Sequence, residues 1–282
     1  MNTVSLDHKT VLQLLPDRDP RGHKGDFGKL LLLCGSRGYT GAAYFAAMGA
    51  LRAGAGLVFL GVPESIYAIE AAKLNEPVVF PLPEEDGRLS AAAIPEILER
   101  LPGMDAVLIG PGIGQSEGTL AVVRAVLERA KCPVIVDADG INVLRAHRDL
   151  LRERKAPTIL TPHGGEFARL GGVIGEDRMA SAAALAGELG CIVLLKGHET
   201  CVTDGVSGCR NRTGNPGMAV GGSGDVLSGV IAALLGAGLP PLEAAACGAW
   251  LHGAAGDLCA SELGQYGMLP TDMLAALPRL LK

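Results

Sequence analysis

Short apolar runs that alternate with longer amphipathic segments constrain the fold of this chain more than any other feature. The runs are rich in Val, Ile and Leu and show no alternation of apolar and polar residues, which is typical of strands covered on both faces of a sheet. This order predicts a mostly parallel sheet with helices on both sides. The predicted strands are Lys29–Cys34, Gly56–Gly61, Pro77–Phe80, Ala106–Gly110, Pro133–Asp137, Thr158–Thr161 and Cys191–Lys196.

The last third of the chain departs from this alternation. Two short runs flank Asp204-Gly205, a hairpin signal that predicts one antiparallel pair of strands, and everything after Ser223 reads as helix. No internal repeat and no linker longer than a loop is present, so we expect one α/β domain over residues 1–282. The predicted helices are Gly41–Ala53, Ala91–Arg100, Glu117–Ala130, Asp177–Leu189, Ser223–Leu235, Leu242–Glu262 and Thr271–Leu281.

Composition and charge argue against several classes of protein. Lys and Arg total 25 and Asp and Glu total 30, with no basic cluster, so we expect no nucleic-acid partner. No apolar run approaches the roughly 18–20 residues of a membrane-spanning helix, and the first residues lack the pattern of a signal peptide. The seven cysteines are scattered without a C-x-x-C pair, which favours reduced core thiols over disulfides or zinc. We therefore expect a cytoplasmic protein with no membrane partner.

Glycine-rich segments follow several of the predicted strands. Gly35–Gly38 follows the first strand, Gly110–Gly114 the fourth and Thr161–Glu166 the sixth. Because ligands of open α/β sheets collect at the carboxyl ends of the strands, these loops predict one extended crevice.

The strongest local signal is the glycine-rich segment 215–229, which leads directly into an apolar helix. It is neither a Walker A loop nor a dinucleotide fingerprint, because no Gly-Lys-Ser/Thr follows and no strand precedes it within a βαβ unit. Asp225 lies at the helix start, where it is either a structural cap or a general base. Unpaired backbone amides at such a start suit a phosphate, so we predict an anion hole made of Gly221, Gly222, Ser223 and Gly224.

Six segments occur in one order along the chain: His23–Gly28, Gly110–Gly114, Val136–Asn142, Thr161–Phe167, Lys196–Thr200 and Asn215–Gly229. In that order they resemble the ADP/ATP-dependent NAD(P)H-hydrate dehydratases, a branch of the ribokinase-like superfamily. The resemblance runs from about His23 to the end of the chain and implies a ribokinase-like three-layer αβα sandwich with a mostly parallel central sheet. It points to the stand-alone dehydratase form. One departure is His163-Gly164-Gly165-Glu166, where the family usually has His-Pro-Gly-Glu.

The resemblance also implies a chemistry. The substrate would be the S-epimer of hydrated NADH or NADPH (NADHX or NADPHX), which carries a hydroxyl at C6 of the nicotinamide ring. ADP, or alternatively ATP, would phosphorylate that hydroxyl, and phosphate would then leave to restore the double bond. The bacterial form of the family suggests ADP as the preferred donor and a homotetramer. Mg²⁺ would be held mainly by the donor phosphates, with Glu166 a candidate for contact through water.

The resemblance also implies roles for individual residues, according to their positions in these motifs. The resemblance assigns the base to Asp225. Adenine-nucleotide contacts fall on Lys196, Gly197, His198, Glu199, Thr200 and Gly224. Contacts with the hydrated dinucleotide fall on Ala43, Gly112, His163 and Asp225, with an uncertainty of one position at Ala43 and Gly112. The segment His23–Asp26 is either a basic lip near the substrate or the start of the first strand. Asp137 and Asp139 either bias the phosphate site or cap loops.

Two other functions stay open from the sequence. A small-molecule kinase of the same fold, of the thiazole or pyridoxal type, would share the first chemical step. A non-catalytic nucleotide sensor would use Asp225 only as a helix cap.

Overall fold

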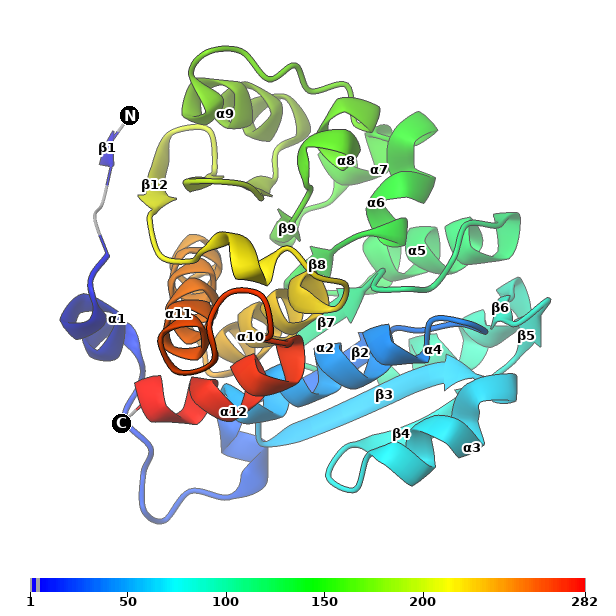
Figure 1. Cartoon of the computed structure of the whole chain (residues 1–282). Helices are drawn as coiled ribbons and strands as arrows, with labels where there is room; N and C mark the ends of the chain where they lie inside the picture. The colour runs from blue at the N-terminus through cyan, green and yellow to red at the C-terminus, as the bar shows by residue number, and fades with distance from the viewer. Residues whose placement is uncertain (1, 4–5, 282) are drawn as a thin grey trace.

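One ten-stranded sheet organises the protein in the computed structural model, which describes residues 2–3 and 6–281 (Figure 1). Its strands are β1 (Asn2–Thr3), β2 (Lys29–Leu33), β3 (Leu57–Pro63), β4 (Val78–Leu82), β7 (Ala106–Ile109), β8 (Val134–Val136), β9 (Thr158–Leu160), β10 (Ile192–Leu195), β11 (Thr200–Thr203) and β12 (Ser207–Asn211). Their order across the sheet is β1-β12-β11-β10-β9-β8-β7-β2-β3-β4. Neighbouring strands are parallel except where β11 pairs with β10 and β12. A separate ribbon pairs β5 (Glu84–Glu85) with β6 (Arg88–Leu89).

Helices cover both faces of this sheet. They are α1 (His8–Leu14), η1 (Lys24–Phe27), α2 (Thr40–Arg52), α3 (Glu64–Lys73), η2 (Ala91–Ala93), α4 (Ile94–Arg100), α5 (Glu117–Arg129), α6 (Asp139–Val143), η3 (Leu144–Ala146), α7 (Asp149–Glu153), α8 (Gly164–Arg169), α9 (Arg178–Leu189), η4 (Pro216–Met218), α10 (Ser223–Gly236), α11 (Pro241–Leu263) and α12 (Pro270–Leu280). Helices α2, α10, α11 and α12 pack on one face, and α5 and α9 pack on the other. The predicted three-layer αβα sandwich with a mostly parallel sheet is confirmed.

The strands are apolar at every position because successive side chains enter two different cores. Leu30 and Leu32 of β2 belong to the core beneath α10, whereas Leu31 and Leu33 belong to the core beneath α5. All four are fully buried. A strand that is covered on both faces has no position for a solvated side chain, which explains the uninterrupted runs in the sequence.

Every predicted strand and helix is present, with small shifts at the ends. The predicted hairpin is confirmed, and Asp204 Oδ1 closes its turn by accepting from the amides of Val206 and Ser207 at 2.8 and 2.7 Å. The sequence prediction missed α1, α3, the short helices α6, α7 and α8, and the β5–β6 ribbon. Apart from the ten-residue α3, these elements are short, so a helical or strand period hardly repeats within them.

The cysteines lie in the core as expected. All seven are free thiols, and six of them are buried. No helix within residues 6–281 combines the length and the apolar character needed to cross a membrane.

Helices α2 and α10 approach more closely than side chains would allow. A Cβ atom at Gly229 would lie 2.1 Å from the carbonyl oxygen of Ala46, and one at Gly49 would lie 2.6 Å from that of Val226. Both of these contacts would be with backbone atoms, which cannot move away as the end of a flexible side chain can. Two glycines therefore fix where the amino end of α10 sits above the sheet.

The segment His23–Asp26 lies at the other end of α10. It precedes Gly28, and a Cβ atom at Gly28 would meet the backbone of Gly236, the last residue of α10, at 2.8 Å. A helix of 14 residues is about 21 Å long. The segment forms the 3-10 helix η1 with its N-cap and leads into β2, which favours the alternative that it is the entry to the first long strand; a role beside the substrate stays a prediction.

We predict that Gly229→Ala lowers the free energy of unfolding by about 2 kcal/mol or more, because the added methyl group must push two helix backbones apart. Denaturant unfolding measures this. Gly187→Ala is the matched control, since Gly187 lies in α9 and a Cβ there meets nothing within 4 Å. It should change stability by less than about 1 kcal/mol, in the stabilising direction. Equal stability of Gly229→Ala and the parent would refute the close-packing constraint.

Candidate active site at the carboxyl edge of the sheet

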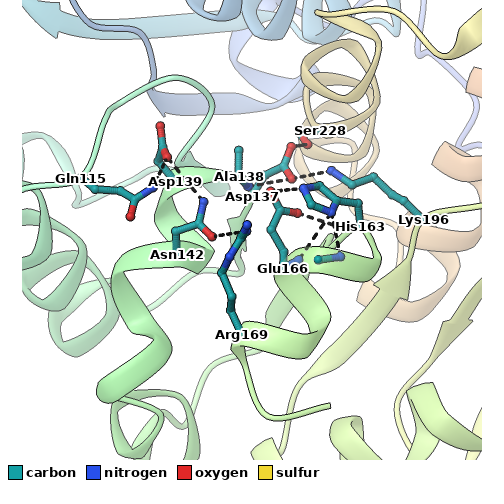
Figure 2. Close-up of polar contacts among 11 residues, drawn as sticks. Gln115, Asp137, Ala138, Asp139, Asn142, His163, Glu166, Arg169, Lys196 and Ser228 are labelled. Carbon is teal, nitrogen blue, oxygen red and sulfur yellow. Dashed lines mark hydrogen bonds and ion pairs between the residues drawn. The ribbon is translucent and has the colours of Figure 1, made fainter. Parts of the chain in front are cut away.

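The carboxyl ends of β8, β9 and β10 meet the amino end of α10 at one edge of the sheet (Figures 1 and 2). Asp137 follows β8 directly, and Lys196 follows β10 directly. Ser228 comes from the second turn of α10. Glu166 comes from α8, and His163 is the residue that precedes α8. The predicted loops Gly35–Gly38, Gly110–Gly114 and Thr161–Glu166 follow the parallel strands β2, β7 and β9, so they lie at the same edge of the sheet.

Asp137 is the most buried acidic group of this site, with 1% of the residue exposed. Its Oδ1 atom accepts hydrogen bonds from Lys196 Nζ and from the amide of Ala138, both at 2.9 Å. Its Oδ2 atom accepts from Ser228 Oγ at 2.6 Å. A buried carboxylate is costly unless its charge is paired and hydrogen-bonded, and Asp137 meets both conditions.

The backbone beside Asp137 is strained. Ala138 has φ 50° and ψ −117°, a conformation that costs a residue with a Cβ of order 1–3 kcal/mol. The turn is packed so tightly that a Cβ at Gly110 would lie 1.9 Å from the carbonyl oxygen of Asp137. Packing thus holds the Asp137 carboxylate in a direction that the unstrained chain would not choose.

Lys196 carries its positive charge to the amino end of α10. Only 21% of its side chain is exposed, and Nζ lies 3.4 Å from the position that a Cβ of Gly224 would occupy. Burial by itself would lower the pKa of Lys196, but the carboxylates of Asp137 and Glu166 outweigh burial and raise that pKa above its usual value. The side chain is therefore an ammonium ion at neutral pH.

Asp225 faces the same space from the first turn of α10. Burial raises the pKa of Asp225 to about 7, with the charge of Asp137 adding to the rise and Lys196 opposing it. Its carboxylate accepts no hydrogen bond from the described residues, and the N-cap of the helix is Gly222. A carboxylate with a pKa near neutrality can take up a proton from a substrate and release it again.

The amino end of α10 supplies unpaired amides. Gly222 adopts φ 97°, and the helix has no side-chain cap. Within the described residues, no backbone acceptor pairs with the amides of Gly224 and Asp225, so they can bind an anion. Gly221 is exposed and has open space around it. Ser223 differs from the prediction, because its amide donates to Val220 O at 3.3 Å.

The predicted loop His163–Glu166 forms the start of α8. His163 Nδ1 accepts from the amides of Gly165 and Glu166 at 3.0 and 3.4 Å, and Glu166 Oε2 accepts from the amide of His163 at 2.9 Å. This reciprocal capping buries the Glu166 carboxyl and leaves about half of the His163 side chain exposed, with Nε2 lying 3.2 Å from Glu166 Oε1. Burial raises the pKa of Glu166, and the Lys196 ammonium opposes the rise.

The predicted nucleotide stretch Lys196–Thr200 is the turn between β10 and β11. Gly197 and His198 are exposed, and Gly197 adopts φ 154°. Thr200 Oγ1 closes the turn by donating to Gly197 O at 3.1 Å, and Glu199 carries a left-handed φ of 53°. The structure brings this stretch and Gly224 together, because Lys196 Nζ lies beside Gly224.

A second polar chain runs along the neighbouring rim (Figure 2). Asp139 accepts from the amide of Gly114 at 3.0 Å and from Gln115 Nε2 at 3.1 Å. Asn142 Oδ1 accepts from Arg169 Nη1 at 3.0 Å. The side chain of Asp139 thereby fastens the Gly110–Gly114 loop to α6, the loop-holding alternative that the sequence left open.

The two predicted dinucleotide contacts Gly112 and Ala43, near the start of α2, differ in their exposure. Gly112 has φ 63°, and a Cβ there would lie 2.7 Å from Ala42 Cβ. Ala43 is fully buried and presents no surface, whereas Ala42 is partly exposed and lies against Gly112. A contact of this position with the dinucleotide stays a prediction.

Sequence reasoning missed two residues of this site. Ser228 lies three positions after Asp225 in an otherwise apolar helix, and a hydroxyl at such a position was the available signal. His252 of α11 is buried, and its Nε2 atom lies 2.8 Å from Ser223 O and 3.2 Å from Ser223 Oγ. Only residues 237–240 separate α10 from α11, but nothing in the sequence shows that the face of α11 carrying His252 packs against the start of α10.

Comparison with known proteins assigns a family to this fold and site. A family model described as NAD(P)H-hydrate dehydratase matches residues 30–279. The chain belongs to the NAD(P)H-hydrate dehydratase family. The bifunctional NAD(P)H-hydrate repair enzyme Nnr of Moorella thermoacetica is 46% identical over 275 residues, which are 95% of this chain and 52% of that protein. The chain thus spans about half the length of this relative of the dehydratase family.

Solved structures agree with this family and with the fold. The ADP/ATP-dependent NAD(P)H-hydrate dehydratase from Bacillus subtilis, co-crystallised with ATP/Mg²⁺, matches with a TM-score of 0.85 and 32% identity, over 99% of this chain and 98% of that one. Ribokinase from Arabidopsis thaliana matches with a TM-score of 0.58 and 19% identity, over 90% and 99% of the two chains. The second match shows the fold alone. The dehydratase family member described here therefore has a ribokinase-like fold, as the sequence predicted.

Burial of His252 generates a prediction about pH. Burial lowers the pKa of His252 to about 4, so the folded protein holds the ring neutral while the unfolded chain takes up a proton near pH 6.5. His252 therefore stabilises the fold above about pH 6.5 and loses that contribution as the pH falls towards 4. We predict that the stability advantage of the parent over His252→Gln shrinks by about 3 kcal/mol across this window. Denaturant unfolding at several pH values measures it, and a difference independent of pH would contradict the assignment.

Proposed function

We propose that this chain dehydrates the S-epimer of hydrated NADH and NADPH, regenerating NADH and NADPH while ADP is converted to AMP and phosphate. The observation that carries the proposal is the meeting of a proton acceptor, an ammonium ion and unpaired helix amides at one edge of the sheet. Asp225, Lys196 and Gly224 supply these three groups. Membership of the dehydratase family and the likeness to a nucleotide-dependent dehydratase of Bacillus subtilis support it.

Dehydration requires a better leaving group than hydroxide. In the proposed first step Asp225 takes the proton of the C6 hydroxyl, the oxygen attacks the terminal phosphorus of ADP, and AMP leaves. In the second step the C6–O bond breaks with its electron pair on the departing phosphate. The ring nitrogen donates electron density to C6, and loss of a proton from C5 restores the ring double bond.

The other groups of the site stabilise charge during phosphoryl transfer. The amides of Gly224 and Asp225 and the ammonium of Lys196 lie where negative charge develops on the transferred group. The turn Lys196–Thr200 binds the nucleotide in this proposal. The exposed edge of His163, with Gly112 and its neighbour Ala42, binds the hydrated dinucleotide.

A magnesium ion fits this site as part of the nucleotide. Among the residues that the structure describes, no group of three or more His, Cys, Asp or Glu side chains could hold a metal. Asp137 is engaged by Lys196 and Ser228, whereas the Glu166 carboxyl lies within electrostatic reach of Lys196 at the start of the nucleotide turn. We propose that Mg²⁺ is held by the donor phosphates with Glu166 one water molecule away, where it would neutralise phosphate charge.

The alternatives fit the geometry less well. A nucleotide sensor would use Asp225 as a helix cap, but the N-cap is Gly222, and Asp225 instead has the raised pKa of a proton acceptor. A small-molecule kinase would use the same first step, and its fold is shared by ribokinase. The nature of the second substrate separates it from a dehydratase.

We extend the proposal to the assembly and its location. Helix α11, which is rich in small residues, is largely buried within its own chain. Tyr67 and Ile69 of α3 and Val78 of the edge strand β4 are apolar side chains exposed at one edge of the sheet. These support association through that edge, and we propose a cytoplasmic homotetramer.

The test is the return of NADH absorbance when the protein is mixed with hydrated NADH, Mg²⁺ and a nucleotide. We predict turnover with ADP at a higher kcat/KM than with ATP. Asp225→Asn should lower kcat by about 10²–10⁴-fold, because the amide cannot take the hydroxyl proton, while ADP affinity measured by calorimetry holds or improves slightly.

The same variant distinguishes the two roles of Asp225. Asn and Asp are nearly equal as helix caps, so a capping role would leave turnover within about threefold of the parent. That result, in a folded variant that binds ADP, would place the base elsewhere. Nucleotide consumption with another alcohol but not with hydrated NADH would favour the kinase.

A further inference from the structure

Asp137 takes no part in the chemistry proposed above, yet it is the central acceptor of the site. It is buried, and its three donors come from three places in the chain: the amide of Ala138, Nζ of Lys196 and Oγ of Ser228. The bonds to Lys196 and Ser228 join the ends of β8 and β10 to the second turn of α10. Their lengths, 2.9 and 2.6 Å, are those of charge-assisted hydrogen bonds.

Lys196 has other carboxylates within its electrostatic reach. The pKa of Lys196, which burial would lower, is raised by Asp137 first, then by Glu166 and also by Asp225. A lysine side chain is a flexible stem with a point charge at its tip. That charge donates a hydrogen bond to Asp137 and lies beside Gly224.

The charged groups that face Asp225 come from several elements. Asp137 and Asp139 come from the end of β8 and from α6, and Glu166 comes from α8; all three raise the pKa of Asp225 after burial does, and Lys196 lowers it. Cys34 at the end of β2 is also near, since burial and then the charge of Asp225 raise the pKa of its thiol. Lys196 is the one cation of this set, so its position decides how far the pKa of Asp225 is raised.

We propose that Asp137 is a positioning residue: it ties Lys196 to the amino end of α10, keeps the ammonium off Asp225, and so leaves Asp225 free to act as the base. The inference rests on the proposed function of Asp225. It adds that the base depends on a carboxylate which touches neither substrate nor nucleotide.

Asp137→Asn is the direct test. Asparagine keeps the size of the side chain and an oxygen for Ser228, but it lacks the charge that holds Lys196. The ammonium should then pair with Asp225, and the acid limb of the pH profile of kcat/KM should move to lower pH by about one unit or more. The plateau value of kcat should fall by roughly tenfold or more, because a paired carboxylate is a weaker base.

Two variants control for a merely structural role. Ser228→Ala removes one hydrogen bond and keeps the Asp137 charge, so its acid limb should stay at the parental pH whatever its stability. Lys196→Gln removes the cation, so its acid limb should move to higher pH, opposite to Asp137→Asn. The loss of the Asp137 charge also lowers the pKa of Asp225 directly, so the Asp137→Asn shift should be clearly smaller in a Lys196→Gln background, and an equal shift there would overturn the positioning role. A folded Asp137→Asn variant with the parental acid limb would overturn the proposal, as would equal shifts in Asp137→Asn and Ser228→Ala.

A titration independent of turnover separates this inference from the proposed function. Carbon-13 NMR of aspartate carboxyl groups follows Asp225 in the free protein, with the signal assigned by its loss in Asp225→Asn. We predict that this signal titrates at lower pH in Asp137→Asn than in the parent, and an unchanged titration would overturn the positioning role. If the shift is present but Asp225→Asn retains activity, the electrostatic coupling stands and the base is another residue.

Discussion

The ion pair between Asp137 and Lys196 is buried at the point where two strands and a helix meet, and the site depends on it. Removing a carboxylate and an ammonium from water is costly, and the cost is offset only when both are paired and hydrogen-bonded. Here the carboxylate is satisfied by Lys196, by Ser228 and by an amide. The fold can therefore keep several further acidic groups nearby without a second cation among them. The raised pKa of Asp225 follows from that arrangement together with burial.

The second constraint is mechanical. Gly229 and Gly49 let α10 lie directly against the backbone of α2, so the amino end of α10 cannot slide relative to the sheet. Its free amides and Asp225 are thereby held at the strand ends from which Asp137 and Lys196 project. The strain at Ala138 is tolerated because packing on both sides fixes the turn. Preorganised charge of this kind is what phosphoryl transfer requires of a protein.

The fold was largely predictable because a strand that is buried on both faces has an uninterrupted run of apolar residues in the sequence. Leu30–Leu33 shows the reason: consecutive residues enter opposite cores, and neither core admits a polar side chain. The helix start at Gly222–Asp225 was predictable for a similar local reason. Short elements such as α8 were missed, although the capping pair His163 and Glu166 marks its start.

The site was predictable only in parts, because its decisive contacts join residues far apart in the chain. Ser228 and Asp137 are separated by 91 positions, and no local pattern predicts that pairing. The resemblance to the family supplied Lys196 and Gly224 as residues around one ligand, but not the hydrogen bonds that hold them. For the same reason the sequence does not show that Ala43 is buried or that His23–Asp26 lies near the carboxyl end of α10, since both are properties of the packed molecule.

The central claim is that phosphorylation of the C6 hydroxyl precedes loss of its oxygen at this site. Hydrated NADH with oxygen-18 in that hydroxyl tests it directly when it is turned over with unlabelled ADP. If phosphate is the leaving group, the labelled oxygen travels with it, and mass spectrometry of the released phosphate should find one oxygen-18 atom per turnover. Unlabelled phosphate with the label in water would mean that hydroxide leaves without being phosphorylated, and it would contradict the role assigned to Asp225 and the α10 amides.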